Sequence, residues 1–452
     1  MDLDRKRSGE VRVKTSLRAW AVLAAIGCGG GDTASDDAAG GGGMGGSGGA
    51  TNGGSSGAGA TGGSAGSGGV GGSSSTGGAA GAPPQEFTLT VSVDGDGRVS
   101  STPAGIDCGS VCELTFASGT EVDLEATAEG GVLTAWGGDC APGDTCSVTM
   151  DADVTVTATF EPFVVGANAH GIAVTPDGTQ ALVTLSENAG TLQVLSLEDG
   201  SIVDSIDVGS FPGAVAVTPD GSKAVVNNLN TVSVVTLSTQ AVATVPSPCA
   251  ADTLYDIAVT PDSTTAVTTM FNGSCVTNTL AVISLGDNSI TVQHPITATL
   301  AAGVAVAGDG NSVLVSRGIV GTLVNRVALS GGAVTDITGT SSSFGIAVTP
   351  DGSEALIASG DGDTIKRVAL TSNMVTGSID YASNQDPHNI AITADGTRAV
   401  AVGSFDVGVL SLASGAIIKT FPGGGRSVAI TPDGKRALVT QGATVRVYSL
   451  PQ

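Results

Sequence analysis

The side chains best suited to chemistry in this sequence are its three histidines and seven cysteines. His170 and His388 stand at the same place in a recurring motif, two residues before an Ile-Ala or equivalent pair. Tyr255 and Arg426 occupy that place in two other copies. Two imidazoles beside a guanidinium, without a carboxylate at that position, form a poor metal site. We therefore expect the four residues to line one rim, as a polar-ligand site or as plain packing, and His294 to be structural.

The sequence carries no motif of a catalytic centre. Outside the Gly-rich segment of residues 29–86, the strings G-x-S-x-G and H-E-x-x-H and the Walker motif are absent. Acidic clusters at 94–96 and 361–363 lack the EF-hand pattern and stand where tight turns are expected. We therefore expect no catalytic residue, no cofactor and no metal.

Six of the cysteines are candidates for disulfide bonds. Their spacings include C-x3-C and C-x5-C, which differ from the C-x2-C of zinc ribbons, and exported chains favour disulfides. We expect pairing within each local pair and a bridge between the last two. Other pairings among the first four cysteines, and free thiols at the last two, are the alternatives. The three pairs are Cys108 with Cys112, Cys140 with Cys146, and Cys249 with Cys275.

The amino-terminal residues 1–28 have the order of an export signal. A basic stretch precedes a short apolar run, Ala19–Gly27, which is too short to span a bilayer. Ala25-Ile26-Gly27-Cys28 resembles the lipobox of bacterial lipoproteins. This resemblance implies cleavage before Cys28 and lipidation of its thiol, and so a membrane partner through a lipid anchor. An ordinary signal peptide with an incidental cysteine is the alternative.

Composition separates the next segment from the rest and limits the partners. Residues 29–86 are Gly, Ser, Ala and Thr with little to bury, which predicts a disordered, low-complexity tether. The whole chain has a formal net charge of −24 and a pI near 4.1. Nucleic-acid binding depends on clustered Lys and Arg, so we expect no nucleic-acid partner.

Residues 87–161 form a separate β-rich segment. FTLTVSV, EVDLEATA and VTVTATF alternate apolar and polar residues, and DGDG at 94–97 indicates a turn. The segment, with its TAWGGDC element, resembles the divergent internalin B-type B-repeat. This resemblance implies a small extracellular module that serves as a spacer or an adhesive unit.

Residues 162–452 are a repeat array with a period near 42 residues, which fits four short strands per unit. In Thr175-Pro176-Asp177-Gly178, proline and glycine stand where a type I turn favours them. The motif copies are GIAVTPDG at 171–178, AVAVTPDG at 214–221, DIAVTPDS at 256–263, GVAVAGDG at 303–310, GIAVTPDG at 345–352, NIAITADG at 389–396 and SVAITPDG at 427–434.

The repeats resemble the YVTN-type β-propeller family, although ALVT, AVVN, ALIA or AVAV replaces the tetrad itself. The resemblance implies an all-β, seven-bladed propeller. The last repeat lacks a fourth strand, and residues 162–166 align with the end of one. We therefore expect these residues to complete blade seven and close the ring.

Taken together, these patterns predict an exported, non-enzymatic lipoprotein of the outer membrane or cell surface, with the periplasm as a further location. Its propeller is expected to be a binding platform for a protein or polysaccharide partner. Related propellers include lactonases and metal oxidoreductases, so a lactonase-like or metal-dependent enzyme is the alternative.

Overall fold

The computed structural model describes residues 85–451 except 109–110, 142, 144, 249–251, 273–278, 297–300, 318–322, 341–342, 360–362 and 382–385. These residues belong to the compact unit Ala80–Gln452. The predictions for the export signal, Cys28 and the tether lie outside the described residues. The same holds for Cys249 and Cys275. Within the described residues, no helix is long and apolar enough to cross a membrane.

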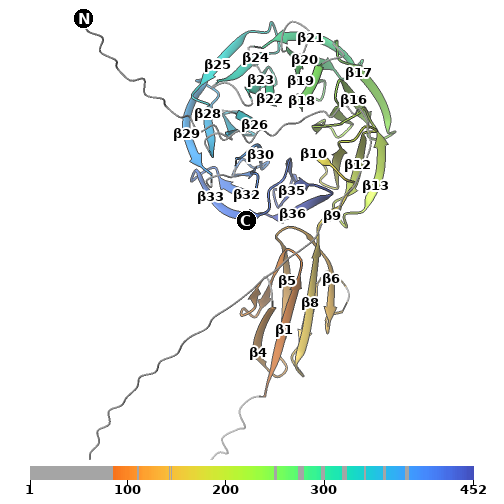
Figure 1. Cartoon of the computed structure of the whole chain (residues 1–452). Helices are drawn as coiled ribbons and strands as arrows, with labels where there is room; N and C mark the ends of the chain where they lie inside the picture. Colours follow the sequence, from red (N-terminus) through yellow and green to blue (C-terminus); the bar gives the residue numbers. More distant parts are fainter. Residues whose placement is uncertain are drawn as a thin grey trace, which may run out of the picture. The chain divides into compact units, whose positions relative to one another are not determined.

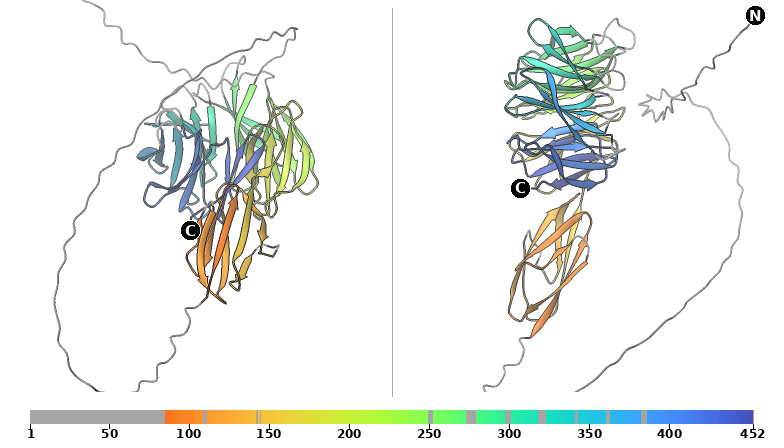
Figure 2. Two further views of the ribbon diagram at one scale, coloured as in Figure 1. Left: turned by 60° about the horizontal axis from the view of Figure 1, so that its bottom comes forward. Right: turned by 90° about the vertical axis from the view of Figure 1, so that its left-hand side faces the viewer.

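The amino-terminal module consists of two four-stranded sheets that enclose one hydrophobic core (Figure 2). Alternate side chains of each strand point inward, because successive side chains of a strand face opposite sides. Trp136 is buried in this core. The first sheet contains β4 (Val111–Ala117), β1 (Glu86–Asp94), β8 (Val154–Glu161) and β6 (Val132–Gly138), in that order. The second contains β3 (Asp107–Cys108), β2 (Gly97–Thr102), β5 (Glu121–Ala128) and β7 (Cys146–Thr149).

The module carries disulfide bonds where the sequence predicts them. Cys140 and Cys146 are bonded, with their Cα atoms 5.6 Å apart, which confirms that local pairing. Cys112 is also disulfide-bonded. The side chain of its expected partner, Cys108, lies outside the described residues.

The repeat array forms seven four-stranded antiparallel sheets among the described residues, arranged around a ring (Figure 1). We call these sheets blades 1 to 7. Blade 1 is β10 (Ala169–Val174), β11 (Gln180–Leu185), β12 (Thr191–Ser196) and β13 (Ile202–Asp207). Blade 2 is β14 (Val215–Val217), β15 (Lys223–Asn227), β16 (Thr231–Thr236) and β17 (Ala241–Pro246). Blade 3 is β18 (Asp252–Val259), β19 (Thr265–Asn272), β20 (Thr279–Ser284) and β21 (Ser289–Pro295).

Blades 4 to 7 repeat the pattern. Blade 4 is β22 (Ala301–Val306), β23 (Ser312–Arg317), β24 (Leu323–Ala328) and β25 (Val334–Thr338). Blade 5 is β26 (Ser343–Val348), β27 (Glu354–Ser359), β28 (Thr364–Ala369) and β29 (Met374–Asp380). Blade 6 is β30 (Asn389–Ile392), β31 (Arg398–Val402), β32 (Asp406–Ser411) and β33 (Ala416–Pro422). Blade 7 is β34 (Val428–Ile430), β35 (Arg436–Gln441), β36 (Thr444–Ser449) and β9 (Phe163–Val164).

Burial follows the order of the strands within a blade. The second and third strands are covered on both faces, as in QALVTL of β11 and TLQVLS of β12, whereas the fourth strand, such as β13, is mostly exposed. Neighbouring blades share hydrophobic clusters: Leu182 of blade 1 and Val226 of blade 2 belong to one such cluster. The core is therefore divided among the seams between blades, which hold the inner strands in place.

The Thr-Pro-Asp-Gly turns join the first and second strands and also connect blades. Thr175 Oγ1 donates to Asp177 Oδ1 at 2.5 Å, and Gln180 N donates to Thr175 Oγ1 at 3.1 Å. Gly178 has a φ of +72°, a conformation that favours glycine. A Cβ there would lie 3.3 Å from Cδ of Pro432 in blade 7. Each of these turns is thus closed by its own threonine and lies against the turn of the neighbouring blade.

The ring closes through the two ends of the array. Phe163 and Val164 of β9 pair with Val445 and Thr444 of β36, so a strand from before the first repeat completes the last blade. The predicted closure is confirmed. β10 of blade 1 also packs against β34 and β35 of blade 7.

Candidate ligand-binding site at the channel mouth

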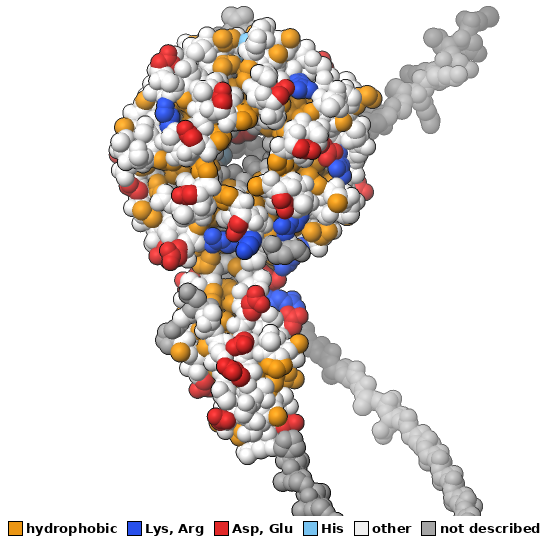
Figure 3. Space-filling view, turned by 180° about the vertical axis from the view of Figure 1, so that it is seen from behind, with side chains coloured by type: hydrophobic (Ala, Val, Ile, Leu, Met, Phe, Trp, Pro, Cys, Tyr) orange, Lys and Arg blue, Asp and Glu red, His pale blue; other side chains and the backbone are white. Residues whose placement is uncertain are grey.

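The four candidate residues share one end of the inner strands. His170 lies in β10 and Tyr255 in β18. His388 directly precedes β30, and Arg426 stands two residues before the start of β34. In Figure 1 the inner strands surround the centre of the ring, and Figure 3 shows an opening there, with acidic side chains around it on the face drawn. The four residues stand at or near the starts of the first strands, whereas the Thr-Pro-Asp-Gly turns follow the ends of those strands. They therefore lie at the end of the ring opposite these turns, which we call the channel mouth.

Thr440 fixes two of these residues relative to each other, through its hydroxyl and its carbonyl oxygen. Thr440 Oγ1 donates to the carbonyl oxygen of His170 in the next blade at 2.7 Å. Arg426 N donates to the carbonyl oxygen of Thr440 at 2.9 Å. Thr440 is the last residue of ALVT, the tetrad that replaces YVTN. Equivalent side chains bond to the next blade elsewhere: Thr184 to Gly213 O (2.6 Å), Asn227 to Asp256 O (2.8 Å) and Ser316 to Phe344 O (2.6 Å).

His388 holds the loop that carries Arg426. Its Nε2 lies 2.9 Å from the carbonyl oxygen of Gly425 in blade 7, and its Nδ1 lies 3.0 Å from the carbonyl oxygen of Asp386. Carbonyl oxygens only accept, so the imidazolium makes both bonds and a neutral ring makes one. His388 therefore acts mainly through the loop, as a link between blades 6 and 7.

The glycines before Arg426 allow this loop to approach its neighbours closely. A Cβ at Gly424 would lie 2.3 Å from the carbonyl oxygen of Gly403, and a Cβ at Gly425 would lie 2.2 Å from Val439 Cγ1. Only glycine fits such positions without a shift of the backbone. The loop is a tightly packed support that presents the guanidinium at the mouth.

His170 and Arg426 influence each other electrostatically. Burial, with a smaller effect from the Arg426 charge, lowers the pKa of His170 from its ordinary value of 6.5 to about 4. The ring is therefore neutral at neutral pH. The Arg426 side chain is exposed, and it makes no ion pair within the described part of the chain. This corner of the mouth combines an available cation with a neutral imidazole.

Asp256, beside Tyr255, is a further residue of the inner strands that sequence reasoning missed. Its Oδ2 accepts from Val304 N of blade 4 at 2.8 Å, and its Oδ1 accepts from Ile257 N at 2.9 Å. Burial raises the pKa of Asp256 to about 6. Three other blades have glycine at the corresponding position of the repeat. A carboxylate in place of a small residue was therefore the sequence signal that could have identified Asp256.

Exposed apolar side chains gather in loops at the same end of the blades. They lie between the fourth strand and the next blade's first strand, at the start of a first strand, or between the second and third strands. Phe211 also has a φ of +50°, which is unusual for a bulky residue. The exposed fractions are 43% for Phe211, 39% for Leu229, 38% for Tyr255 and 64% for Phe405.

His294 lies elsewhere, at a seam between blades. Its Nε2 is 3.1 Å from the carbonyl oxygen of Leu329 in blade 4, and the side chain is buried. This agrees with a structural role. Within the described residues, no group of three or more His, Cys, Asp or Glu side chains is placed to hold a metal ion.

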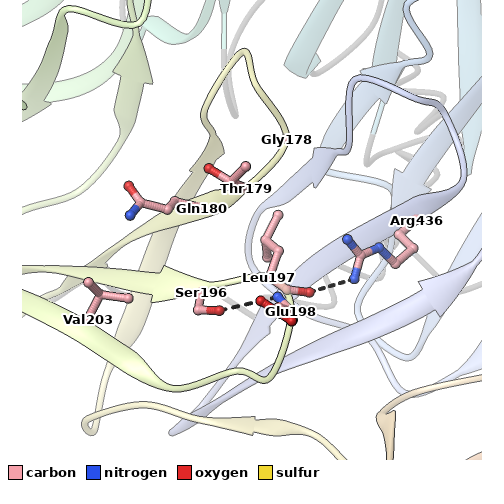
Figure 4. Close-up of a pocket in the computed structure, with 8 residues that line it drawn as sticks. All are labelled: Gly178, Thr179, Gln180, Ser196, Leu197, Glu198, Val203 and Arg436. Atoms are coloured by element: carbon pink, nitrogen blue, oxygen red, sulfur yellow. Dashed lines mark hydrogen bonds between the residues drawn. The ribbon is translucent and has the colours of Figure 1, made fainter. Parts of the chain in front are cut away.

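A pocket of about 440 Å³ lies at the seam between blades 7 and 1, away from the mouth (Figure 4). Its guanidinium, from Arg436, donates to the carbonyl oxygen of Leu197 at 2.8 Å. Glu198 N donates to Ser196 Oγ at 3.3 Å in the same pocket. The cation of this pocket thus joins two blades, which makes the pocket a feature of ring closure.

Comparison with known proteins supports both parts of the fold. Residues 87–163 match the divergent InlB B-repeat domain family, which confirms the resemblance of the module. The structure is similar to a solved chain of hydrazine synthase from Kuenenia stuttgartiensis, with a TM-score of 0.55 and 18% identity over 64% of this chain and 96% of that chain. At this identity the likeness shows a propeller-like fold alone. No curated protein matches the chain. The B-repeat and the disulfide indicate an extracytoplasmic protein.

Proposed function

We propose that this chain is a non-enzymatic binding protein whose propeller recognises a partner at the channel mouth. The supporting observation is that the exposed Phe405, Phe211 and Arg426 on loops, and Tyr255 in the first half of β18, lie at one end of the blades. Aromatic and arginine side chains dominate the energetics of protein interfaces. The opposite end carries nearly uniform turns. Binding residues usually stand on varied loops held by a rigid scaffold.

The rest of the chain fits delivery of such a platform outside the cell. The repeats are of the YVTN type, Cys28 is the lipidation site, and the glycine-rich segment holds the folded parts away from a membrane. The lipid is the membrane contact because a chain with a net charge of −24 is repelled by anionic lipid. Mass spectrometry of the mature amino terminus tests this part, and an unmodified Cys28 within an intact chain would contradict it.

Affinity capture from surface extracts, with the full chain as bait, tests the binding function. A variant with Phe405→Ser and Phe211→Ser is compared with a matched variant carrying Met374→Ser and Ile418→Ser on outer strands. Met374 is 63% exposed and Ile418 is 48% exposed, so both variants remove similar apolar surface. We expect the mouth variant alone to lose a partner that wild type captures. Equal capture by both variants would contradict the proposal.

A further inference from the structure

We infer that Arg426 and His170 form a carboxylate subsite, and that its ligand is a peptide segment with one carboxylate beside an apolar side chain. The inference rests on the proposed function and names the chemistry of the partner. Guanidinium groups recognise carboxylates through charge-assisted, often bidentate hydrogen bonds.

The first support is that Arg426 differs from other arginines of the ring. The chain has only 18 basic residues against 42 acidic ones. Several of these cations bond to the next blade: Arg436 to Leu197 O at 2.8 Å, Arg326 to Leu370 O at 2.6 Å and Arg367 to Leu412 O at 2.9 Å. No such bond or ion pair engages the Arg426 guanidinium within the described residues. A scarce cation is thus exposed at the mouth.

The second support is that hydrogen bonds hold the backbone around Arg426 in place. Arg426 N is bonded to Thr440 O, Gly425 O to His388, and Gly423 N donates to Phe405 O at 2.9 Å. A guanidinium on a fixed loop loses less freedom on binding than one on a mobile loop. The loop also ties Arg426 to the exposed Phe405.

The third support is the neutral imidazole of His170, whose backbone is joined to that of Arg426 through Thr440. A carboxylate that pairs with Arg426 comes within the range of the His170 ring, whose pKa the Arg426 charge now helps to lower. An anion there favours the imidazolium, which then donates a hydrogen bond to it. Binding should therefore be coupled to proton uptake by His170. The affinity should rise as the pH falls from the raised pKa of the bound protein to the value of about 4 in the free protein.

Charge and exposed surface identify a peptide with a single carboxylate. A net charge of −24 disfavours a polyanion, which needs several cations in one place. Phe405, 64% exposed, offers an apolar contact on the neighbouring loop, which is bonded to the Arg426 loop through Gly423 N. A carboxylate with an adjacent apolar side chain satisfies both groups at once.

The inference can be tested directly on the histidine rings, because the chain has three histidines and each ring can be followed separately. The pKa of each ring is measured by NMR with acetyl-Leu-Glu-Leu-amide and with the matched peptide acetyl-Leu-Gln-Leu-amide. We expect the Glu peptide to raise the pKa of His170 by about one unit and the Gln peptide to leave it unchanged. His294, at its remote seam, is the internal control. No shift of His170, or the same shift with both peptides, overturns the inference.

Two variants complete the test. Arg426→Gln should raise the pKa of His170 in the free protein and abolish its response to the Glu peptide. A response that persists in this variant overturns the subsite. If the Phe405 and Phe211 variant loses a captured partner while the Glu peptide has no effect on His170, the proposed function stands and the carboxylate inference fails.

Discussion

At the scale of single residues, the pKa values of two half-buried titratable groups of the inner strands, His170 and Asp256, are shifted in opposite directions. Burial lowers the pKa of His170 to about 4, so its ring is neutral at neutral pH, and burial raises the pKa of Asp256 to about 6. Desolvation disfavours the charged form in both cases. His170 could be identified from the sequence because it differs from the residues at the same position of most other repeats. The role of Asp256 could not be, because its bond to Val304 N depends on how blades 3 and 4 pack.

These pKa shifts determine whether each residue stabilises or destabilises the fold as the pH changes. The unfolded chain binds more protons at His170 between its ordinary pKa of 6.5 and the folded value of about 4, so this residue costs stability as the pH falls through that window. Asp256 behaves oppositely, because the folded chain binds more protons between 3.8 and about 6, and its contribution is lost as the pH rises.

We therefore expect His170→Asn to reduce the acid loss of stability by about 1–2 kcal/mol between pH 7 and pH 4.5. Asp256→Asn should increase the loss of stability between pH 7 and pH 4.5, because it removes a group that binds a proton more tightly in the folded chain. Denaturant unfolding of wild type and both variants measures this. Parallel pH profiles for all three proteins would show that neither group is coupled to folding.

At the scale of elements, the repeat motif predicts each blade well because its information is local. Threonine, proline, aspartate and glycine close the turn within the motif, and the following apolar run forms a buried second strand. The glycine loop at 423–425 was not predicted, since its importance comes from contacts with Gly403 and Val439 in the folded ring. The bond between His388 and Gly425 O likewise depends on two blades.

Substitution of this loop should be costly. In Gly425→Ala, the new Cβ would meet Val439 Cγ1 at 2.2 Å and the Thr440 carbonyl oxygen at 2.8 Å. We expect a destabilisation of about 1–3 kcal/mol, as for other forced contacts in packed regions. Gly213→Ala is the control, because the nearest atom to its Cβ would be 3.9 Å away. Equal thermal midpoints for the two variants would refute the packing argument.

At the scale of the whole molecule, closure of the ring joins the beginning and the end of the repeat array. The incomplete last repeat and the short segment before the first made this closure predictable. The pairing of β9 with β36 confirms it. Loops at the mouth were less predictable because their lengths and residues vary between repeats.

Removal of β9 should therefore weaken blade 7. A chain that begins at Gly171 lacks Phe163, which is buried in the cluster shared by blades 1 and 7. It also exposes the edge of β36, and exposed edges promote association. We expect a lower thermal midpoint and more self-association than in a chain that begins at Glu161. Calorimetry and light scattering compare the two, and identical behaviour would contradict closure by β9.

The central claim is that the channel mouth is the binding surface of the propeller. Hydrogen–deuterium exchange of the full chain, with and without the partner obtained by capture, measures this most directly. We predict that the partner slows exchange in the mouth loops at 209–213, 403–406 and 423–427, and leaves the Thr-Pro-Asp-Gly turns at 175–178 and 431–434 unchanged. Protection confined to residues 87–161, or to those turns, would contradict the claim and assign binding to another part of the chain.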